Sequence, residues 1–316
     1  MKVKVFILAL FFPSICLSQD ISMEIDTLNL SVYGQLTETA VFEDNFYFIF
    51  QSKRRNTSVS FKSIKVFDLN GKFIENVFLP LSAISMPYYD LRINDQRLYL
   101  KQESSLSEKT FLLEKYVANF NQISDTLVYI LDDSDFKIYP NCWGEWGGST
   151  YFENKDNGKV YELSSSCTYN FEKANLGYLL TNRHEILVIK NPTDLYESQL
   201  TFDRSYLDKQ NQGIDTLFKS EFDLYTTFQK DDELMVVYGD STNTHVGILI
   251  DQELTPIYDF GYPYRFSNWF KNNQTDIQIL KMYTYDRITE LGGLIGYRVL
   301  GFLLINDGNL RLYYIN

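Results

Sequence analysis

The stretch Asn45–Leu79, NFYFIFQSKRRNTSVSFKSIKVFDLNGKFIENVFL, decides the fold class. Its segments Asn45–Gln51, Ser63–Asp68 and Lys72–Leu79 each alternate apolar and polar residues, which is typical of half-buried strands. Asn70-Gly71 separates the last two segments, and Asn-Gly between two such runs is the strongest short-range signal for a β-hairpin. The stretch therefore predicts antiparallel strands joined by a tight turn.

The same pattern returns along the chain. Further strands are predicted at 97–101, 112–119, 150–153, 159–163, 185–190, 199–203, 233–238, 246–250, 277–282, 298–305 and 310–315. Turns near positions 70, 121, 165, 204, 252 and 307, taken as equivalent, are 39 to 55 residues apart. A four-stranded propeller blade needs about 40–50 residues. The sequence therefore predicts an all-β fold, a single β-propeller of about six four-stranded blades, with five or seven blades as alternatives.

A second repeated motif bears on how the ring closes. Asp26-Thr27-Leu28, Asp125-Thr126-Leu127 and Asp215-Thr216-Leu217 recur at intervals of 99 and 90 residues, about two blades each. We place these strands at blade edges. The strand predicted at Ser22–Ser31 then becomes the outer strand of the last blade and joins the two ends of the chain. The alternative is that Gly308–Asn316 already fills that position.

The N-terminus predicts export. Lys2 and Lys4 precede the apolar run Val5–Phe12, which is too short to span a bilayer. We therefore expect residues 1–18 to be a signal peptide cleaved between Ser18 and Gln19, and residues 19–316 to form the propeller. The alternative is a lipid anchor on Cys16, although Ile15 is not the small residue such an anchor needs. Cys142 and Cys167 remain in the mature chain and either form a disulfide or stay as two unpaired thiols.

The charge balance excludes some partners. The formal net charge is −12, and removal of residues 1–18, which hold two lysines and no acidic residue, makes it −14. Such a surface repels nucleic acid and anionic membranes, so we expect neither as a partner. No second apolar run is long enough to span a membrane. We expect a monomer without a cofactor.

The segment Ile64–Phe73 resembles the repeat signature of NHL-like and TolB-like six-bladed propellers. In that signature a strand ends at an Asp, turns through a Gly and re-enters as the outer strand, as Asp68 and Gly71 do here. The units around Gly247–Gln252 and Phe302–Gly308 match it in part, whereas the third unit turns through Ser164–Ser166. The exported six-bladed propellers of Gram-negative envelope bacteria are similar to this chain. The resemblance implies a fold and an exported binding role, and it implies no specific activity.

Residues that would carry catalysis or bind metal are sparse. His184 and His245 lie at predicted strand ends, without a serine motif around them, and are interpreted as hydrogen-bonded structural groups. The run Asp132–Asp135 is acidic, but it lacks the spacing of an EF-hand loop and is interpreted as a solvated turn. A glycosidase would need two facing carboxylates. The candidates for such a pair are Asp90, Asp133, Asp135, Glu145 and Asp223.

Aromatic loops give the more specific prediction. The segments 86–90, 139–146 and 262–269 each place a proline beside an aromatic residue, and we expect them to connect the outer strand of one blade to the inner strand of the next. Their rings would stack on sugars or peptide side chains, or alternatively fill the channel. The predicted binding residues are Tyr88, Tyr89, Trp143, Trp146, Tyr264, Arg265 and Trp269. We expect a non-catalytic module that binds a protein, peptide or glycan. The alternatives are a carbohydrate hydrolase or lyase, and a structural envelope protein.

Overall fold

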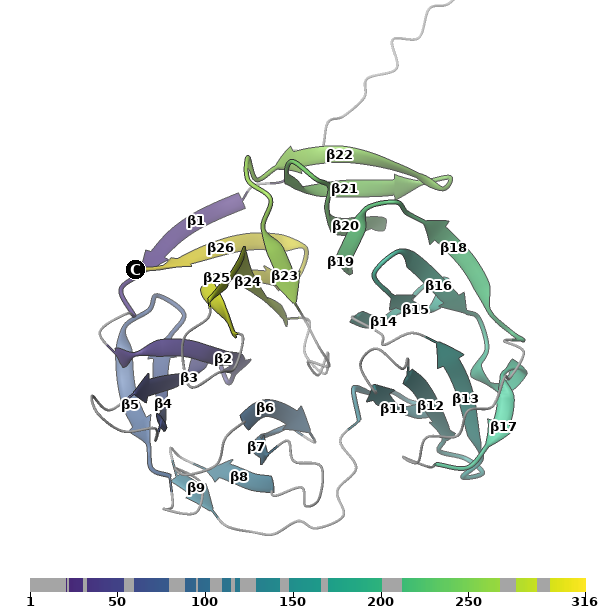
Figure 1. Cartoon of the computed structure of the whole chain (residues 1–316). Helices are drawn as coiled ribbons and strands as arrows, with labels where there is room; N and C mark the ends of the chain where they lie inside the picture. The colour runs from purple at the N-terminus through teal and green to yellow at the C-terminus, as the bar shows by residue number, and fades with distance from the viewer. Residues whose placement is uncertain are drawn as a thin grey trace, which may run out of the picture.

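The computed structural model is a six-bladed β-propeller, as the sequence predicts, with six small sheets arranged in a ring (Figure 1). It describes residues 21, 23–30, 33–53, 60–79, 89–94, 96–102, 110–114, 117–119, 129–142, 148–165, 170–200, 212–267, 277–288 and 296–316. No helix in these ranges is long and apolar enough to cross a membrane.

The first three blades follow one another along the chain, and each pairs its strands antiparallel. Blade 1 contains β2 (Gln35–Phe42), β3 (Asn45–Lys53), β4 (Ser60–Asp68) and β5 (Phe73–Val77). Blade 2 contains β6 (Tyr89–Asn94), β7 (Arg97–Gln102), β8 (Thr110–Glu114) and β9 (Val117–Asn119). Blade 3 contains β10 (Leu131–Asp132), β11 (Phe136–Cys142), β12 (Gly148–Asn154) and β13 (Val160–Ser165).

The last three blades complete the ring, and their four core strands are again antiparallel neighbours. Blade 4 contains β14 (Asn170–Ala174), β15 (Gly177–Thr181), β16 (Glu185–Ile189) and β18 (Asp215–Lys219). Blade 5 contains β19 (Asp223–Lys230), β20 (Glu233–Gly239), β21 (Thr244–Ile250) and β22 (Glu253–Asp259). Blade 6 contains β23 (Arg265–Ser267), β24 (Ile277–Ile288), β25 (Gly296–Asn306) and β26 (Asn309–Ile315).

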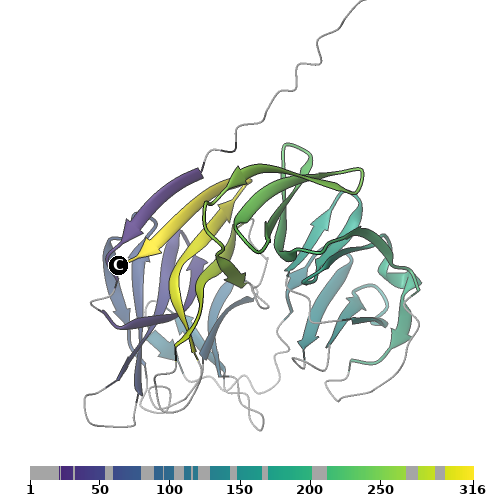
Figure 2. The ribbon, with the colours of Figure 1, turned by 45° about the horizontal axis from the view of Figure 1, so that its top comes forward.

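Two blades carry a fifth strand. β1 (Met23–Leu28) pairs parallel with β26 on the outer edge of blade 6, and the two run side by side in Figure 2. The ring therefore uses both strands that the sequence offers: β26 is the fourth strand and β1 covers it. β17 (Tyr196–Ser198), which follows the short 3-10 helix η3 (Pro192–Asp194), leaves blade 4 and pairs antiparallel with β13 of blade 3.

The hairpin turns confirm some of the predicted turn positions and correct one of them. Asp68 accepts hydrogen bonds on Oδ1 from the amides of Asn70 and Lys72, and Gly71 adopts a φ of +79°, which favours glycine. Asp251-Gln252 and Asp307-Gly308 turn at the equivalent place in blades 5 and 6. The predicted serine turn of the third unit is wrong, because Ser164 and Ser165 pair with β12 and belong to β13. The equivalent turn in blade 3 is the one containing Asn157-Gly158.

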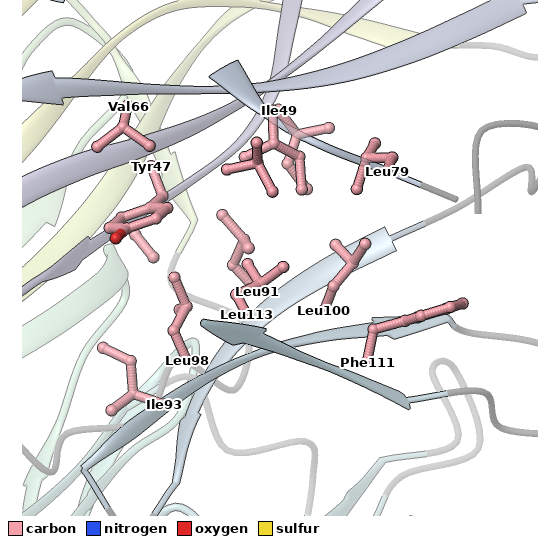
Figure 3. Packing of buried hydrophobic residues seen from close by; sticks show 13 residues of the cluster. Tyr47, Ile49, Val66, Leu79, Leu91, Ile93, Leu98, Leu100, Phe111 and Leu113 are labelled. Carbon is pink, nitrogen blue, oxygen red and sulfur yellow. The ribbon is translucent and has the colours of Figure 1, made fainter. Parts of the chain in front are cut away.

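Apolar side chains fill the space between neighbouring sheets. The cluster between blades 1 and 2 contains Ile49 and Val66 from one sheet and Leu91 and Leu100 from the other, and Figure 3 shows these side chains facing each other. Similar clusters join blades 1 and 6, 5 and 6, 3 and 4, and 4 and 5. Burial of apolar area contributes about 25 cal/mol per Å², so these seams hold the ring together.

Candidate functional site

The predicted binding residues fall unevenly on the described part of the chain. Tyr264 and Arg265 are described, and they lie at the junction of blades 5 and 6. Tyr89 is the first residue of β6, the innermost strand of blade 2. The others lie outside the described residues; they are Tyr88, Trp143, Trp146 and Trp269, together with Cys167 of the predicted disulfide.

One of the three predicted connections is placed differently. Residues 139–142 do not link two blades but form the end of β11, the second strand of blade 3, where Tyr139 pairs with Tyr151. Tyr139 is buried, and its hydroxyl donates to Glu153 Oε2 at 2.7 Å. The sequence did not indicate this position, because β10, the first strand of blade 3, has only two residues and is too short to be recognised as a strand.

Residues 260–264 do connect two blades, running from β22 to β23. We call the face of the ring that holds such connections the top face. The Tyr264 carbonyl accepts hydrogen bonds from Thr244 Oγ1 at 2.8 Å and from Tyr225 Oη at 3.1 Å. The Tyr262 carbonyl accepts from the amides of Thr244 and Tyr264. Hydrogen bonds to the carbonyl oxygens of Tyr262 and Tyr264 therefore fix the turn.

This turn presents one ring to solvent and buries the next. Tyr262 is 49% exposed, and its ring lies 4.8 Å from that of the buried Tyr264. The Tyr264 hydroxyl is 2.7 Å from that of Tyr314 in β26. Burial raises the pKa of Tyr264, and the hydrogen bond with Tyr314 raises it further. Tyr264 therefore anchors the turn as a neutral phenol, and Tyr262 is the ring available to a ligand.

A second exposed ring on the top face was missed by sequence reasoning. Phe222 is 42% exposed and lies in the connection from blade 4 to blade 5. Its ring centroid is 5.6 Å from that of Tyr238, which stacks on His245 at 5.2 Å. Phe222 lies in a loop, whereas Tyr238 and His245 are cross-strand partners in β20 and β21, so no contiguous motif marks the three rings.

Both histidines are hydrogen-bonded, as expected. His245 Nε2 lies 3.2 Å from Asp240 Oδ2, and Asp240 also accepts from the amides of Thr242 and Asn243. The bond from the Asn243 amide is the main cause of a pKa of Asp240 well below its usual range. His184 Nδ1 lies 3.2 Å from the Phe222 carbonyl oxygen.

We define the blade 5 top patch as Phe222, Tyr238, His245 and Tyr262, with the carboxylates of Asp240 and Asp259. Asp259 accepts from the Gly261 amide at 2.7 Å and from Asn243 Nδ2 at 2.8 Å, so it holds the same turn that carries Tyr262. The patch combines two exposed rings, Phe222 and Tyr262, with a hydrogen-bonded base. Such a surface can stack on flat or apolar groups.

Among the described acidic candidates, Asp133 and Asp135 share one lysine, whereas Asp223 lies apart from them with an arginine. Asp133, in the turn between β10 and β11, accepts from Lys173 Nζ at 2.8 Å and from Tyr178 Oη at 2.5 Å. Burial opposes ionisation of Asp133, but these bonds outweigh it and lower its pKa. Asp135 lies 3.7 Å from the same Lys173 ammonium. Asp223 instead forms a two-bond ion pair with Arg183, at 2.7 and 3.0 Å, on the top face.

The remaining acidic candidates are Asp90 and Glu145. Asp90 is the second residue of β6, and Glu145 lies outside the described residues. Within the described ranges no group of three His, Cys, Asp or Glu side chains is arranged to hold a metal ion. The turn at 132–135 is instead bound by Lys173 and by Lys155, which contacts Asp132.

Two polar groups near the innermost strands were also missed. The Glu38 cluster consists of Glu38, Lys62, Lys281 and Tyr283, in which Lys281 forms a salt bridge with Glu38. Burial lowers the pKa of Lys62 to about 8, and Glu38 opposes this shift. The Thr227 network consists of Asn170, Thr181, Thr226, Thr227 and Gln278 and spans blades 4, 5 and 6.

The comparisons with known proteins assign this chain neither a family nor an activity. No protein-family model and no curated protein matches the chain. Among solved structures, a prolyl endopeptidase aligns at 10% identity and a TM-score of 0.43, over 88% of this chain and 41% of its own. The β-propeller domain of the Trilobed protease from Pyrococcus furiosus aligns at 12% identity and a TM-score of 0.38, and the alignment covers 88% of this chain and 97% of that domain. A GH43_1 enzyme from Xanthomonas citri aligns at 10% identity and a TM-score of 0.32, and the alignment covers 89% of this chain and 91% of the enzyme. The chain thus spans about two fifths of the first protein, and at these scores no activity is transferred from any of them.

Proposed function

We propose that this protein is an exported, non-catalytic propeller that binds a protein, peptide or glycan on its top face. The observation that carries the proposal is the exposure of two rings, Phe222 and Tyr262, on the hydrogen-bonded base of the blade 5 top patch. Rigid aromatic side chains offer a large contact area at a low cost in conformational entropy. The predicted residues Tyr88, Trp143, Trp146 and Trp269 belong to the same proposal.

The electrostatics favour binding over hydrolysis. A glycosidase needs two carboxylates about 5–10 Å apart, one of which keeps its proton. Asp133 of blade 3 and Asp223 of blade 5 are each bound to a cation of blade 4, and the pKa of Asp133 is lowered. Neither of these two candidates is therefore suited to act as the acid of such a pair.

A thermal-shift screen of residues 19–316 against oligosaccharides and peptidoglycan fragments tests the proposal. A ligand at 100 times its dissociation constant stabilises the folded state by about 2.7 kcal/mol. Tyr262→Ala and Phe222→Ala should each remove most of the shift. Leu176→Ala is the control, because Leu176 is an exposed apolar residue that lies in the tight turn between β14 and β15, away from the top face.

The outcomes separate the alternatives. A shift that Tyr262→Ala leaves unchanged would place the ligand elsewhere and contradict the proposed site. Release of a reducing sugar during the screen would identify a hydrolase. With no shift, affinity capture from envelope extracts with the wild type and with Tyr262→Ala tests for a protein partner. Intact mass of the exported protein checks cleavage after Ser18 and reports whether Cys142 and Cys167 are oxidised.

A further inference from the structure

Blades 3 and 6 show how this propeller covers the edge of a sheet. Each edge is paired with a fifth strand from elsewhere in the chain, and the added strand brings a carboxylate to a cation of the host blade. In blade 6, Glu24 and Asp26 of β1 pair with Arg311 of β26. In blade 3, Glu197 of β17 lies 2.8 Å from the ammonium of Lys159, the residue just before β13.

Blades 4 and 5 end on their fourth strands and are protected in another way. An exposed strand edge is a template for pairing with another chain, and natural proteins protect it with charges and proline. In β18 the exposed side chains are polar, and Asp215 is already paired with Lys190 at 2.6 Å. In β22, Pro256 interrupts the strand and Glu253 is exposed. Neither edge presents an apolar surface suited to a further strand.

The edge of blade 1 differs from both. β5 is the last strand of this sheet in the described residues, and its first four side chains are exposed. Ile74 is 40% exposed, and Phe78 directly after the strand is 71% exposed. Two large apolar side chains thus lie exposed at this edge, with one acidic residue, Glu75, between them and no proline within the strand. Since proteins normally protect such an edge, we infer that it has an occupant.

The turn before β5 resembles the turn before β13, which does receive a fifth strand, although it is one residue shorter. Asn70-Gly71-Lys72 precedes β5, and Asn157-Gly158-Lys159 precedes β13. Gly71 and Gly158 have φ values of +79° and +69°, and each amide bonds back to the residue that begins the turn, Asp68 or Asn154. Lys72 therefore occupies the position from which Lys159 binds the added strand.

We infer that the edge of blade 1 docks an extended segment of a partner protein, which adds to β5 as a fifth strand. Its apolar side chains would pack on Ile74 and Phe78, and a carboxylate would bind Lys72. Strand addition takes its affinity from main-chain hydrogen bonds and its specificity from alternate side chains. The other cation here, Lys65, is already bonded to Asn76 and lies over the rings of Tyr33 and Phe73, so Lys72 is the group that favours a partner strand with a carboxylate. This surface is separate from the blade 5 top patch.

The test uses a strand of known behaviour as the probe. A fluorescein-labelled peptide with the sequence of residues 21–30, which includes β1, is titrated with residues 19–316 and followed by fluorescence anisotropy. Saturable binding is expected, with Ile74→Lys and Lys72→Glu each weakening it about tenfold, as is typical when an interface loses a matched group. The peptide carrying Glu24→Lys and Asp26→Lys should bind more weakly to the wild type.

Matched controls keep the test decisive. Ile250→Lys and Lys219→Glu change exposed residues of the same types in blades 5 and 4 and should leave the affinity unchanged. If the peptide instead exchanges with β1 at blade 6, the blade 1 variants will not alter binding, and the inference is wrong. Failure to saturate at about 1 mM, an affinity near −4 kcal/mol, also overturns it. A wild-type dimer by light scattering that Ile74→Lys dissociates would show that the occupant is a second copy of this chain.

Discussion

The Glu38 cluster and the Thr227 network lie at corresponding depths in the ring but satisfy their polar groups differently. Each adjoins a β-bulge in a first strand, between Leu36 and Glu38 in β2 and between Leu224 and Thr226 in β19. A bulge turns a side chain away from the regular alternation. In one region the redirected group is a carboxylate between lysines, whereas in the other it is a pair of threonines.

The difference predicts different responses to pH. In the Thr227 network neutral groups bond to one another: the Thr227 carbonyl accepts from Asn170 Nδ2 at 2.9 Å and from Gln278 Nε2 at 3.1 Å. In the Glu38 cluster the attraction between charges must offset the cost of removing them from water. Glu172, beside the network, is the exception, because burial raises its pKa to about 7 although Thr227 and the Gln229 amide oppose this.

The largest expected effect is that of Glu38→Gln. This change keeps the shape of the side chain but removes the countercharge of Lys281 and Lys62. Breaking a buried ion pair by removing one partner costs about 3–5 kcal/mol. Urea denaturation at pH 7 measures the loss, with Glu75→Gln on exposed β5 as a control expected to change stability by less than about 0.5 kcal/mol. Equal effects of the two substitutions would contradict an ionic role for the cluster.

Glu172→Gln should stabilise the protein, and only at higher pH. The folded-state pKa of about 7 lies above the usual 4.5, so the wild type loses stability as pH rises from about 4.5 through 7. The full shift corresponds to about 3 kcal/mol. Unfolding curves of both proteins should therefore coincide near pH 4.5 and separate by up to this amount at pH 8. A constant difference across this range would show that Glu172 ionises normally.

Lys62→Met should show the opposite dependence and a smaller effect. The folded-state pKa of Lys62 is about 8, below the usual 10.5, so the wild type loses stability as pH falls from about 10.5 through 8. We expect Lys62→Met to gain about 2 kcal/mol relative to the wild type between pH 10 and pH 7. Lys72→Met, an exposed change in the same blade, is the control and should give no such trend.

The sequence predicted the elements that local chemistry determines. Alternation and the turn at Asn70-Gly71 located blade 1, and the connection carrying Tyr264 was placed correctly. The sequence did not reveal features decided by distant contacts. β17 is only three residues long and pairs with a different blade from its neighbours, so no local signal marks it. The Phe222 ring reaches Tyr238 from the connection before blade 5, and Glu38 meets Lys281 from the far end of the chain.

The smallest expected effect is that of Thr226→Val, which tests the uncharged Thr227 network. Thr226→Val removes the hydroxyl that donates to Gln278 Oε1 at 2.8 Å and keeps the shape of the side chain. Because no charge is involved, we expect a loss of about 1 kcal/mol that is the same at pH 5 and pH 9, whereas the effects of Glu172→Gln and Lys62→Met change between these pH values. Hydrogen exchange should then show faster opening at the seam of blades 5 and 6 without a pH trend of its own. A loss that grows with pH would mean that the Thr227 network depends on the ionisation of Glu172. Both regions would then depend on charge, and only the size of that dependence would differ between them.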